Sequence, residues 1–300
     1  MNDTSTPTTT TLSFKIASMP IGSGFTWFKN GFLLLKAQPW SLFITAAWTI
    51  LLSLLINSVP FIGLALSTVV MPALSFGMAD VAQKIRLQQG VTPFDVFSGF
   101  HANHRTRLFA LGAIIAIIPA AVALILQQVD TTPIAKAIEL FSNTQPATNL
   151  SEATTIASEN RLKLENLYFN DPAFYKAINS LYLLTFTMMG LIALFVYSPL
   201  FLVWQNTSPL RAMLYSVITI LKNILPLIVL GCLMLFAFFV ISILLSILTA
   251  VAPLISTWLI LPAICLFTAL NYAVIFASYH NIIMASLKKA VNQNPMSANT

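Results

Sequence analysis

Charged side chains are scarce in this sequence. Only 8% of its residues are Asp, Glu, Lys or Arg, whereas a soluble domain carries about 25%. No charged residue lies between Lys222 and Lys288, and residues 37–79, 108–129 and 177–210 are uncharged as well. Together with 57% hydrophobic residues, this scarcity excludes an ordinary soluble domain.

Motifs of catalysis and phosphate binding are also missing. The sequence has no Gly-rich phosphate loop, no Gly-x-Ser-x-Gly and no His-Glu-x-x-His. The two cysteines, Cys232 and Cys265, lie in apolar segments and form no Cys-x-x-Cys pair, so we expect packed thiols rather than a disulfide. We therefore expect no enzyme and no cofactor.

Residues that could bind a metal are few. His101 and His104 are three residues apart, on one face of a helix, but no third acidic or cysteine ligand is near them and His280 is distant. We expect no metal site. The segment from His101 to Arg107 is interpreted instead as a cationic patch that contacts lipid phosphates and fixes orientation.

Long apolar segments are what the sequence has in place of these features. A hydrocarbon layer about 30 Å thick requires roughly 20 apolar helical residues, and barrel strands would alternate in polarity instead. The predicted fold class is therefore all-α, as a polytopic membrane protein. Six transmembrane helices are predicted, at about residues 38–57, 61–80, 107–127, 178–204, 224–249 and 254–284.

Short proline-containing turns without charge join the first two and the last two of these helices. Recurring prolines suggest three helical hairpins, each preceded by an interfacial amphipathic helix. The predicted division is a disordered cytoplasmic tail at 1–24 and three units at 25–90, 91–207 and 208–300, the last ending in a short cytoplasmic tail. The second unit contains a polar insertion at 128–177.

The polar insertion carries its own helix signals. Ser151 can cap a helix in which acidic residues precede basic ones, as the helix dipole favours. Asp171 is expected to be an N-cap and Pro172 the first-turn proline of a helix. This helix should begin there and continue into the fourth span. We expect an ordered subdomain that offers a surface to a protein partner.

Lys and Arg are concentrated on one side of the predicted spans. With both termini inside, the inside segments carry a strong positive excess, while the insertion at 128–177 carries a net negative charge. Basic residues near span ends set topology, so both termini are predicted to be cytoplasmic. No organelle signal is visible, which favours a bacterial inner membrane with the insertion in the periplasm.

Amphipathic segments precede the hairpins on this basic side. Aromatic and basic residues are interleaved between Phe25 and Lys36, and apolar residues recur at helical spacing in 209–222. Such segments suit the headgroup plane of an anionic membrane, although short cytoplasmic helices covering the span ends would look the same. The residues predicted to contact anionic phospholipid headgroups, rather than nucleic acid, are Lys29, Lys36, Arg105, Arg107, Arg211 and Lys222.

Ionisable residues deep in the spans, which a proton- or sodium-coupled transporter retains, are missing. Asp80 lies at the basic end of the second span, where Lys84 four residues later predicts a salt bridge.

In the third span Gly112, Ala116 and Ala120 form a stripe of small residues that predicts a helix contact.

Three motifs carry a family resemblance. They are the segment from Trp27 through Gly31 to Pro39, Pro60-Phe-Ile-Gly63 and Pro72-Ala-Leu-Ser-Phe-Gly77. Over residues 25–100 the chain resembles a proteobacterial family of multi-pass inner-membrane proteins to which no activity is assigned. The resemblance implies a bacterial inner membrane and a six-span fold.

Two functions remain open from the sequence. The leading hypothesis is a non-enzymatic scaffold or envelope partner whose contacts are made by residues 128–177. The alternative is a permease or lipid-handling carrier for a neutral or amphiphilic substrate, with a path between the repeated units. A water-lined cavity reaching the middle of the membrane would favour the carrier, and a dry interior would favour the scaffold.

Overall fold

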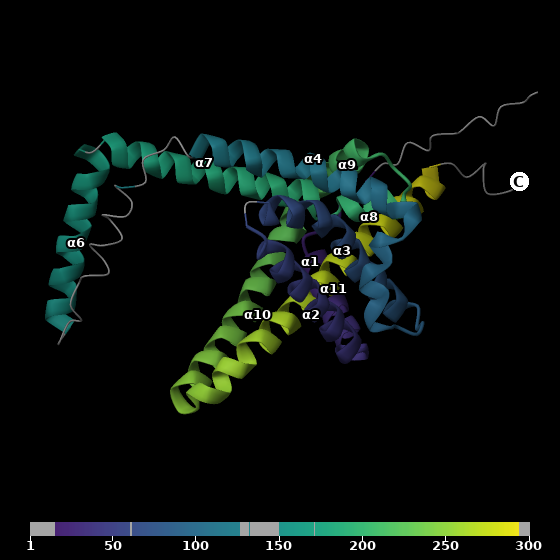
Figure 1. The fold of residues 1–300 in the computed structure, drawn as a ribbon, viewed down its shortest axis with the longest axis horizontal. Coiled ribbons are helices and arrows are strands. Elements are labelled where there is room, and N and C mark those ends of the chain that lie inside the picture. The colour runs from purple at the N-terminus through teal and green to yellow at the C-terminus, as the bar shows by residue number, and fades with distance from the viewer. Residues whose placement is uncertain (1–15, 61, 127–131, 133–149, 171, 294–300) are drawn as a thin grey trace, which may run out of the picture. The chain divides into compact units, whose positions relative to one another are not determined.

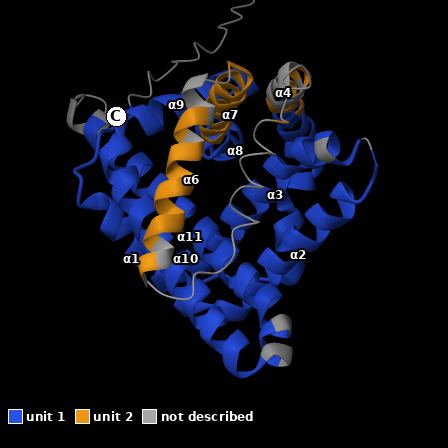
Figure 2. Ribbon diagram, turned by 90° about the vertical axis from the view of Figure 1, so that its left-hand side faces the viewer, with its two compact units in different colours: residues 1–112, 193–300 blue, residues 113–192 orange. Residues whose placement is uncertain are grey.

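The computed structural model is built of helices, and the residues it describes contain no strand, which confirms the all-α class. The chain divides into two compact units (Figure 2), unit 1 with residues 1–112 and 193–300 and unit 2 with residues 113–192. The residues that the structure describes (Figure 1) are 16–60, 62–126, 132, 150–170 and 172–293.

Several helical segments are long and apolar enough to cross a membrane, which is compatible with the predicted multi-pass architecture. The third predicted span falls on α4 (Ala102–Leu126), a 25-residue helix that is not among these candidates in the described part of the chain. The six-span arrangement therefore stays a prediction. The five candidates are Pro39–Asn57, Ala65–Arg86, Pro172–Trp204, Ile224–Val251 and Trp258–Lys289.

Unit 1 combines helices from both ends of the chain. Its α10 and α11 lie side by side as a hairpin (Figure 1), as do α2 and α3. The helices that lie wholly in unit 1 are α1 (Ser23–Ala37), α2 (Pro39–Asn57), α3 (Gly63–Arg86), the 3₁₀ helix η1 (Pro93–Phe100), α8 (Ser198–Trp204), α9 (Pro209–Lys222), α10 (Ile224–Val251) and α11 (Pro253–Gln293).

Proline sets several helix starts. Pro39, Pro93 and Pro209 each lie in the first turn of a helix, where the missing N–H would have no partner anyway. Pro199 also lies in the first turn of a helix, α8, and within the predicted span 178–204 the helix is broken just before it, between Phe195 and Ser198. The span is therefore interrupted between α7 and α8.

The core of unit 1 lies around α11. The side chains of Trp27, Tyr197, Phe201 and Phe276 are almost completely buried. Helix α1 packs against both α10 and α11, so one face of this predicted interfacial helix is part of the protein core.

Two glycines allow α1 to approach its neighbours closely. A Cβ added at Gly24 would overlap the carbonyl oxygen of Pro226, and one added at Gly31 would overlap Val274. On the other face of α1, Phe25 and Phe32 are exposed, as a helix at a lipid interface requires.

Helix α9 turns its small and polar residues inward. Ala212, Ser216 and Thr219 are buried, whereas Leu210 and Leu214 are exposed. This is the reverse of a soluble amphipathic helix, in which the apolar stripe faces the core. The exposed apolar stripe suits a helix that lies at a lipid surface.

The segment just before α1 is held by hydrogen bonds, although the sequence places it in a disordered tail ending at residue 24. Asn223 is fully buried; its side chain donates to the carbonyl of Ala17 at 3.2 Å and accepts from the N–H of Met19 at 2.8 Å. Ser286 accepts from the N–H of Ala17 at 2.9 Å. The predicted tail therefore reaches too far, and its residues 1–15 lie outside the described part of the chain.

Unit 2 contains α6 (Leu150–Asn170) and most of α7 (Pro172–Phe195). Helix α7 begins at Pro172, as the sequence predicts. On α6 Arg161 pairs with Glu165 at 2.9 Å. Residues 127–131 and 133–149 of the predicted insertion lie outside the described residues.

Candidate functional site

A partly polar pocket of about 510 Å³ lies between α1, the end of α3 and α11. Three side-chain amides and two basic groups line it, from segments far apart in the sequence. None of its lining residues is a carboxylic acid. The polar lining residues are Asn30, Arg86, Gln88, His280 and Asn281.

Arg86 and His280 are in direct contact in this pocket. The guanidinium Nη1 lies 2.9 Å from Nδ1 of the imidazole, and because a guanidinium only donates, Nδ1 is the acceptor and the proton lies on Nε2. The ring of His280 stacks on Phe276 with centroids 6.1 Å apart. In the sequence His280 is distant from the other histidines, and no motif singles out Arg86.

Gln88 lines the pocket from an unusual backbone conformation. It follows the end of α3 with a φ of 56°, the left-handed region that favours glycine. The N–H of Gln88 donates to the carbonyl of Ile85 and that of Gln89 to Lys84, which closes the helix as a Schellman motif. A residue with a side chain thus occupies a position where glycine would be less strained, and this residue lines the pocket.

An apolar groove of about 710 Å³ lies between α2 and the α10–α11 hairpin. Its lining side chains are apolar or aromatic, and among them Trp40 is 74% exposed. Pro39 lines this groove, while Ala37, on the other side of the break between α1 and α2, lines the polar pocket. The two cavities therefore both reach the α1–α2 junction, one from each side of the break, and have no lining residue in common.

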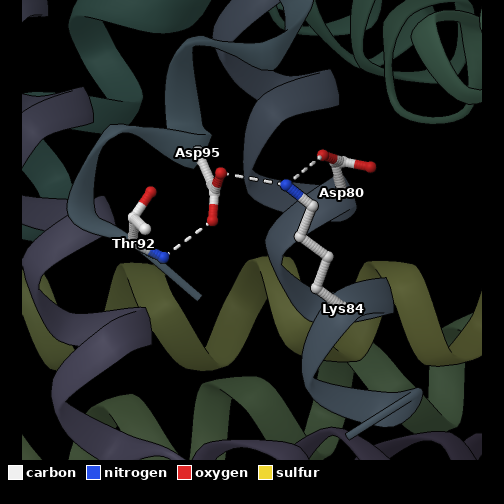
Figure 3. Close-up of polar contacts among 4 residues, drawn as sticks. All are labelled: Asp80, Lys84, Thr92 and Asp95. Carbon is white, nitrogen blue, oxygen red and sulfur yellow. Dashed lines mark hydrogen bonds and ion pairs between the residues drawn. The ribbon is translucent and has the colours of Figure 1, made fainter. Parts of the chain in front are cut away.

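An ion-pair cluster fixes η1 on α3 (Figure 3). Lys84 Nζ lies 3.5 Å from Asp80, the predicted pair, and 2.9 Å from Oδ1 of Asp95. The other carboxylate oxygen of Asp95 accepts from the N–H of Thr92 at 2.7 Å. The predictable signal for Asp95 is the capping box, with Thr92 at the N-cap and an acid three residues later.

The electrostatics of this cluster favour an ionised Asp95. Burial alone would raise its pKa, but the hydrogen bond from the Thr92 N–H and the contact with Lys84 outweigh burial and hold the pKa below the ordinary value. Both carboxylates are thus engaged with Lys84, and the cluster acts as a structural clamp.

The predicted headgroup residues divide into two groups. Arg107 is tied to the end of α8, since its guanidinium donates to Oδ1 of Asn206 at 2.6 and 2.8 Å and to the carbonyl of Leu202 at 3.0 Å. Lys222 is exposed but its Nζ lies 3.3 Å from the carbonyl of Ile16. The other predicted residues are exposed: Lys29, Lys36, Arg105 and Arg211.

The predicted stripe of small residues begins at a close contact. A Cβ added at Gly112 would overlap the carbonyl oxygen of Val69 on α3. Ala116 is half-buried, and the side chain of Ala120 lies outside the described residues.

Histidines and cysteines do not gather in the described part of the chain. His101 is exposed and His104 half-buried, and no three His, Cys, Asp or Glu side chains there lie close enough to hold a metal ion. Cys232 and Cys265 are both free thiols.

The membrane character of the chain rests on its apolar helices alone. The family resemblance of residues 25–100 stays a prediction. Comparison of the chain with protein-family models, with curated proteins and with solved structures finds no match.

Proposed function

We propose that this protein is a non-enzymatic integral protein of a bacterial inner membrane that holds an amphiphilic lipid. This is the lipid-handling alternative that the sequence leaves open. The observation that carries it is the apolar groove of about 710 Å³, which reaches the α1–α2 junction from one side of the break while a polar pocket of about 510 Å³ reaches it from the other. An apolar cavity beside a polar one matches the two parts of a lipid.

The size and lining of the groove support an acyl chain. Cavities of roughly 300 to 1,000 Å³ hold small molecules, and a lining without charged groups suits hydrocarbon. Lipid tails are about as apolar as these side chains, so transfer from the bilayer into the groove contributes little free energy. Selection of one lipid must therefore depend on the polar pocket.

A scaffold remains the second candidate function. The observation in its favour is the exposure of α10: only 6% of the most apolar stretch of this helix is buried inside the protein. Exposed aromatic side chains on this helix, such as Phe236 and Phe239, offer area to a partner helix as well as to lipid. A protein partner bound through residues 128–177 also stays a prediction.

For the arrangement in the membrane we propose six spans in three hairpins, with both termini cytoplasmic. Supporting this count, α4 has 25 residues and a length of about 37 Å, which exceeds the roughly 30 Å of hydrocarbon. The segments α1, η1 and α9 precede the proposed hairpins.

Filling the groove tests the proposed function. Ala263 lines the groove, and Ala263→Trp would occupy it, whereas Ala250→Trp adds the same bulk at an exposed site on α10 outside the lining. After mild detergent extraction, native mass spectrometry should find lipid on the wild type and on Ala250→Trp. At most about half as much should remain on Ala263→Trp, and equal retention by both variants would contradict the proposal.

A further inference from the structure

The polar pocket contains a positive charge without an acidic partner. Arg86 contacts the neutral acceptor Nδ1 of His280, and no ion pair joins Arg86 to a carboxylate within the described residues. The acids Asp80 and Asp95 pair with Lys84 instead. Arg86 is exposed, so its guanidinium, which is always charged, can be reached by an anion from outside the protein.

The pocket also brings hydrogen-bond donors together from three segments. Side-chain amides of Asn30, Gln88 and Asn281 line it together with Arg86 and His280. Arg alone can satisfy a carboxylate through its two parallel N–H bonds. Phosphate has more acceptor oxygens, so it can use the amides as well as the guanidinium.

Gln88 adds an independent observation. Its backbone lies in the left-handed region at a helix end where glycine is usual, and its side chain lines the pocket. Residues with a strained backbone cluster at ligand sites and other functional sites. A role for Gln88 in closing α3 alone would be better served by glycine.

We propose that the pocket of Arg86 and His280 binds a phosphate group, supplied by the headgroup of an anionic phospholipid whose acyl chain lies in the apolar groove. The inference rests on the proposed function and names the lipid class. The pocket lies at the basic end of the α3 span, where headgroups are expected. An acyl chain is about as stable in the bilayer as in the groove, so the polar pocket must determine which lipid is bound.

Lipid competition on the full chain tests the proposal. In detergent with equal amounts of phosphatidylglycerol and phosphatidylcholine, native mass spectrometry should show preferential binding of phosphatidylglycerol. Arg86→Gln should reduce that preference about tenfold, the effect of losing one charge-assisted contact. Arg161→Gln removes the same charge from an exposed site on α6 that lies outside the pocket and is not a predicted headgroup residue, so this control should keep the preference.

Gln88→Gly separates ligand binding from structure. Glycine relieves the left-handed backbone, so the thermal midpoint without lipid should stay the same or rise. The additional stabilisation by phosphatidylglycerol should shrink, because one amide donor is lost. If the lipid-induced shift of the midpoint stays at its wild-type size, Gln88 is not a ligand and this part of the site is overturned.

Three further outcomes would overturn the proposal at different levels. Wild-type protein that retains both lipids equally overturns the phosphate site and leaves the proposed function standing. Wild-type protein that retains neither lipid overturns both. In the third outcome, glycerol 3-phosphate without lipid raises the thermal midpoint of the wild type as much as phosphatidylglycerol does and leaves that of Arg86→Gln unchanged. In that outcome the pocket binds the phosphate of a soluble ester, and the lipid as its source is overturned.

Discussion

At the scale of single residues, the cytoplasmic-side charges of the predicted topology have distinct roles. Arg107 holds the end of α8 through Asn206, and Lys84 holds η1 through Asp95. Among the described residues, Arg86 contacts His280 and forms no ion pair with a carboxylate. All three bases thus join elements, and Arg86 differs in that its partner is a neutral imidazole on α11.

We expect Asp95→Asn to destabilise the protein. The change removes a charge-assisted contact worth about 1.5 to 3 kcal/mol, and the thermal midpoint should fall more than in Asp80→Asn, whose oxygen lies farther from Lys84. Equal effects of the two substitutions would contradict the assignment of Asp95 as the stronger partner.

The same contact predicts a pH dependence. Because the pKa of Asp95 in the folded protein lies below its ordinary value of 3.8, its stabilisation is complete above about pH 4 to 5 and is lost as pH falls through the folded pKa. The difference in thermal midpoint between wild type and Asp95→Asn should therefore close in acid. A difference in midpoint that does not shrink at all as the pH falls below the ordinary pKa would show that the charge is not its cause.

At the scale of elements, close backbone contacts join the helices of unit 1. A Cβ added at Gly77 of α3 would overlap the carbonyl oxygen of Val96 in η1, and one at Gly99 of η1 would overlap that of Ala73 in α3. The two contacts are reciprocal. The second predicted pre-helix is thus a 3₁₀ helix packed closely on α3 and not a free interfacial helix.

Alanine at these glycines should separate η1 from α3. Gly77→Ala should lower the thermal midpoint, because carbonyl oxygens of the backbone cannot move aside without shifting η1. Gly231→Ala on α10, where nothing lies within 4 Å of the added Cβ, should be neutral or stabilising by up to about 1 kcal/mol, the difference in helix propensity. If both substitutions have the same effect, the contact is not tight.

At the scale of the whole molecule, the role of α4 decides the topology. If α4 crosses the membrane, six spans return the chain to the side where it started. If it does not, the five candidate spans place Thr300 opposite to the N-terminus. Helix α11, with 41 residues and a length of about 60 Å, is twice the hydrocarbon thickness, so part of it extends beyond the membrane.

Reporter fusions distinguish these topologies. Fusions after Gly90 and after Thr300 should report the cytoplasm, and one within residues 143–149 should report the periplasm. A cytoplasmic signal from residues 143–149 would remove α4 as a span, and a periplasmic signal at Thr300 would leave an odd number of spans.

Local chemistry was sufficient for several of the predictions. Apolar segments without charge predict membrane helices, since lipid requires that backbone groups pair within each segment. Asp171-Pro172 predicts the start of α7, and Asp80 with Lys84 at i,i+4 predicts an ion pair, because both depend only on neighbouring residues. All-α class and helix starts thus follow from the sequence by itself.

Only the tertiary structure decided which faces of these helices meet. Asn30, Arg86 and His280 are far apart in the chain and form one pocket because α1 and α3 both pack on α11. Uniformly apolar helices do not indicate which side faces protein and which faces lipid, since both surroundings are equally apolar. The glycine contacts of α1 and the grouping of the pocket residues therefore could not be derived from local pattern.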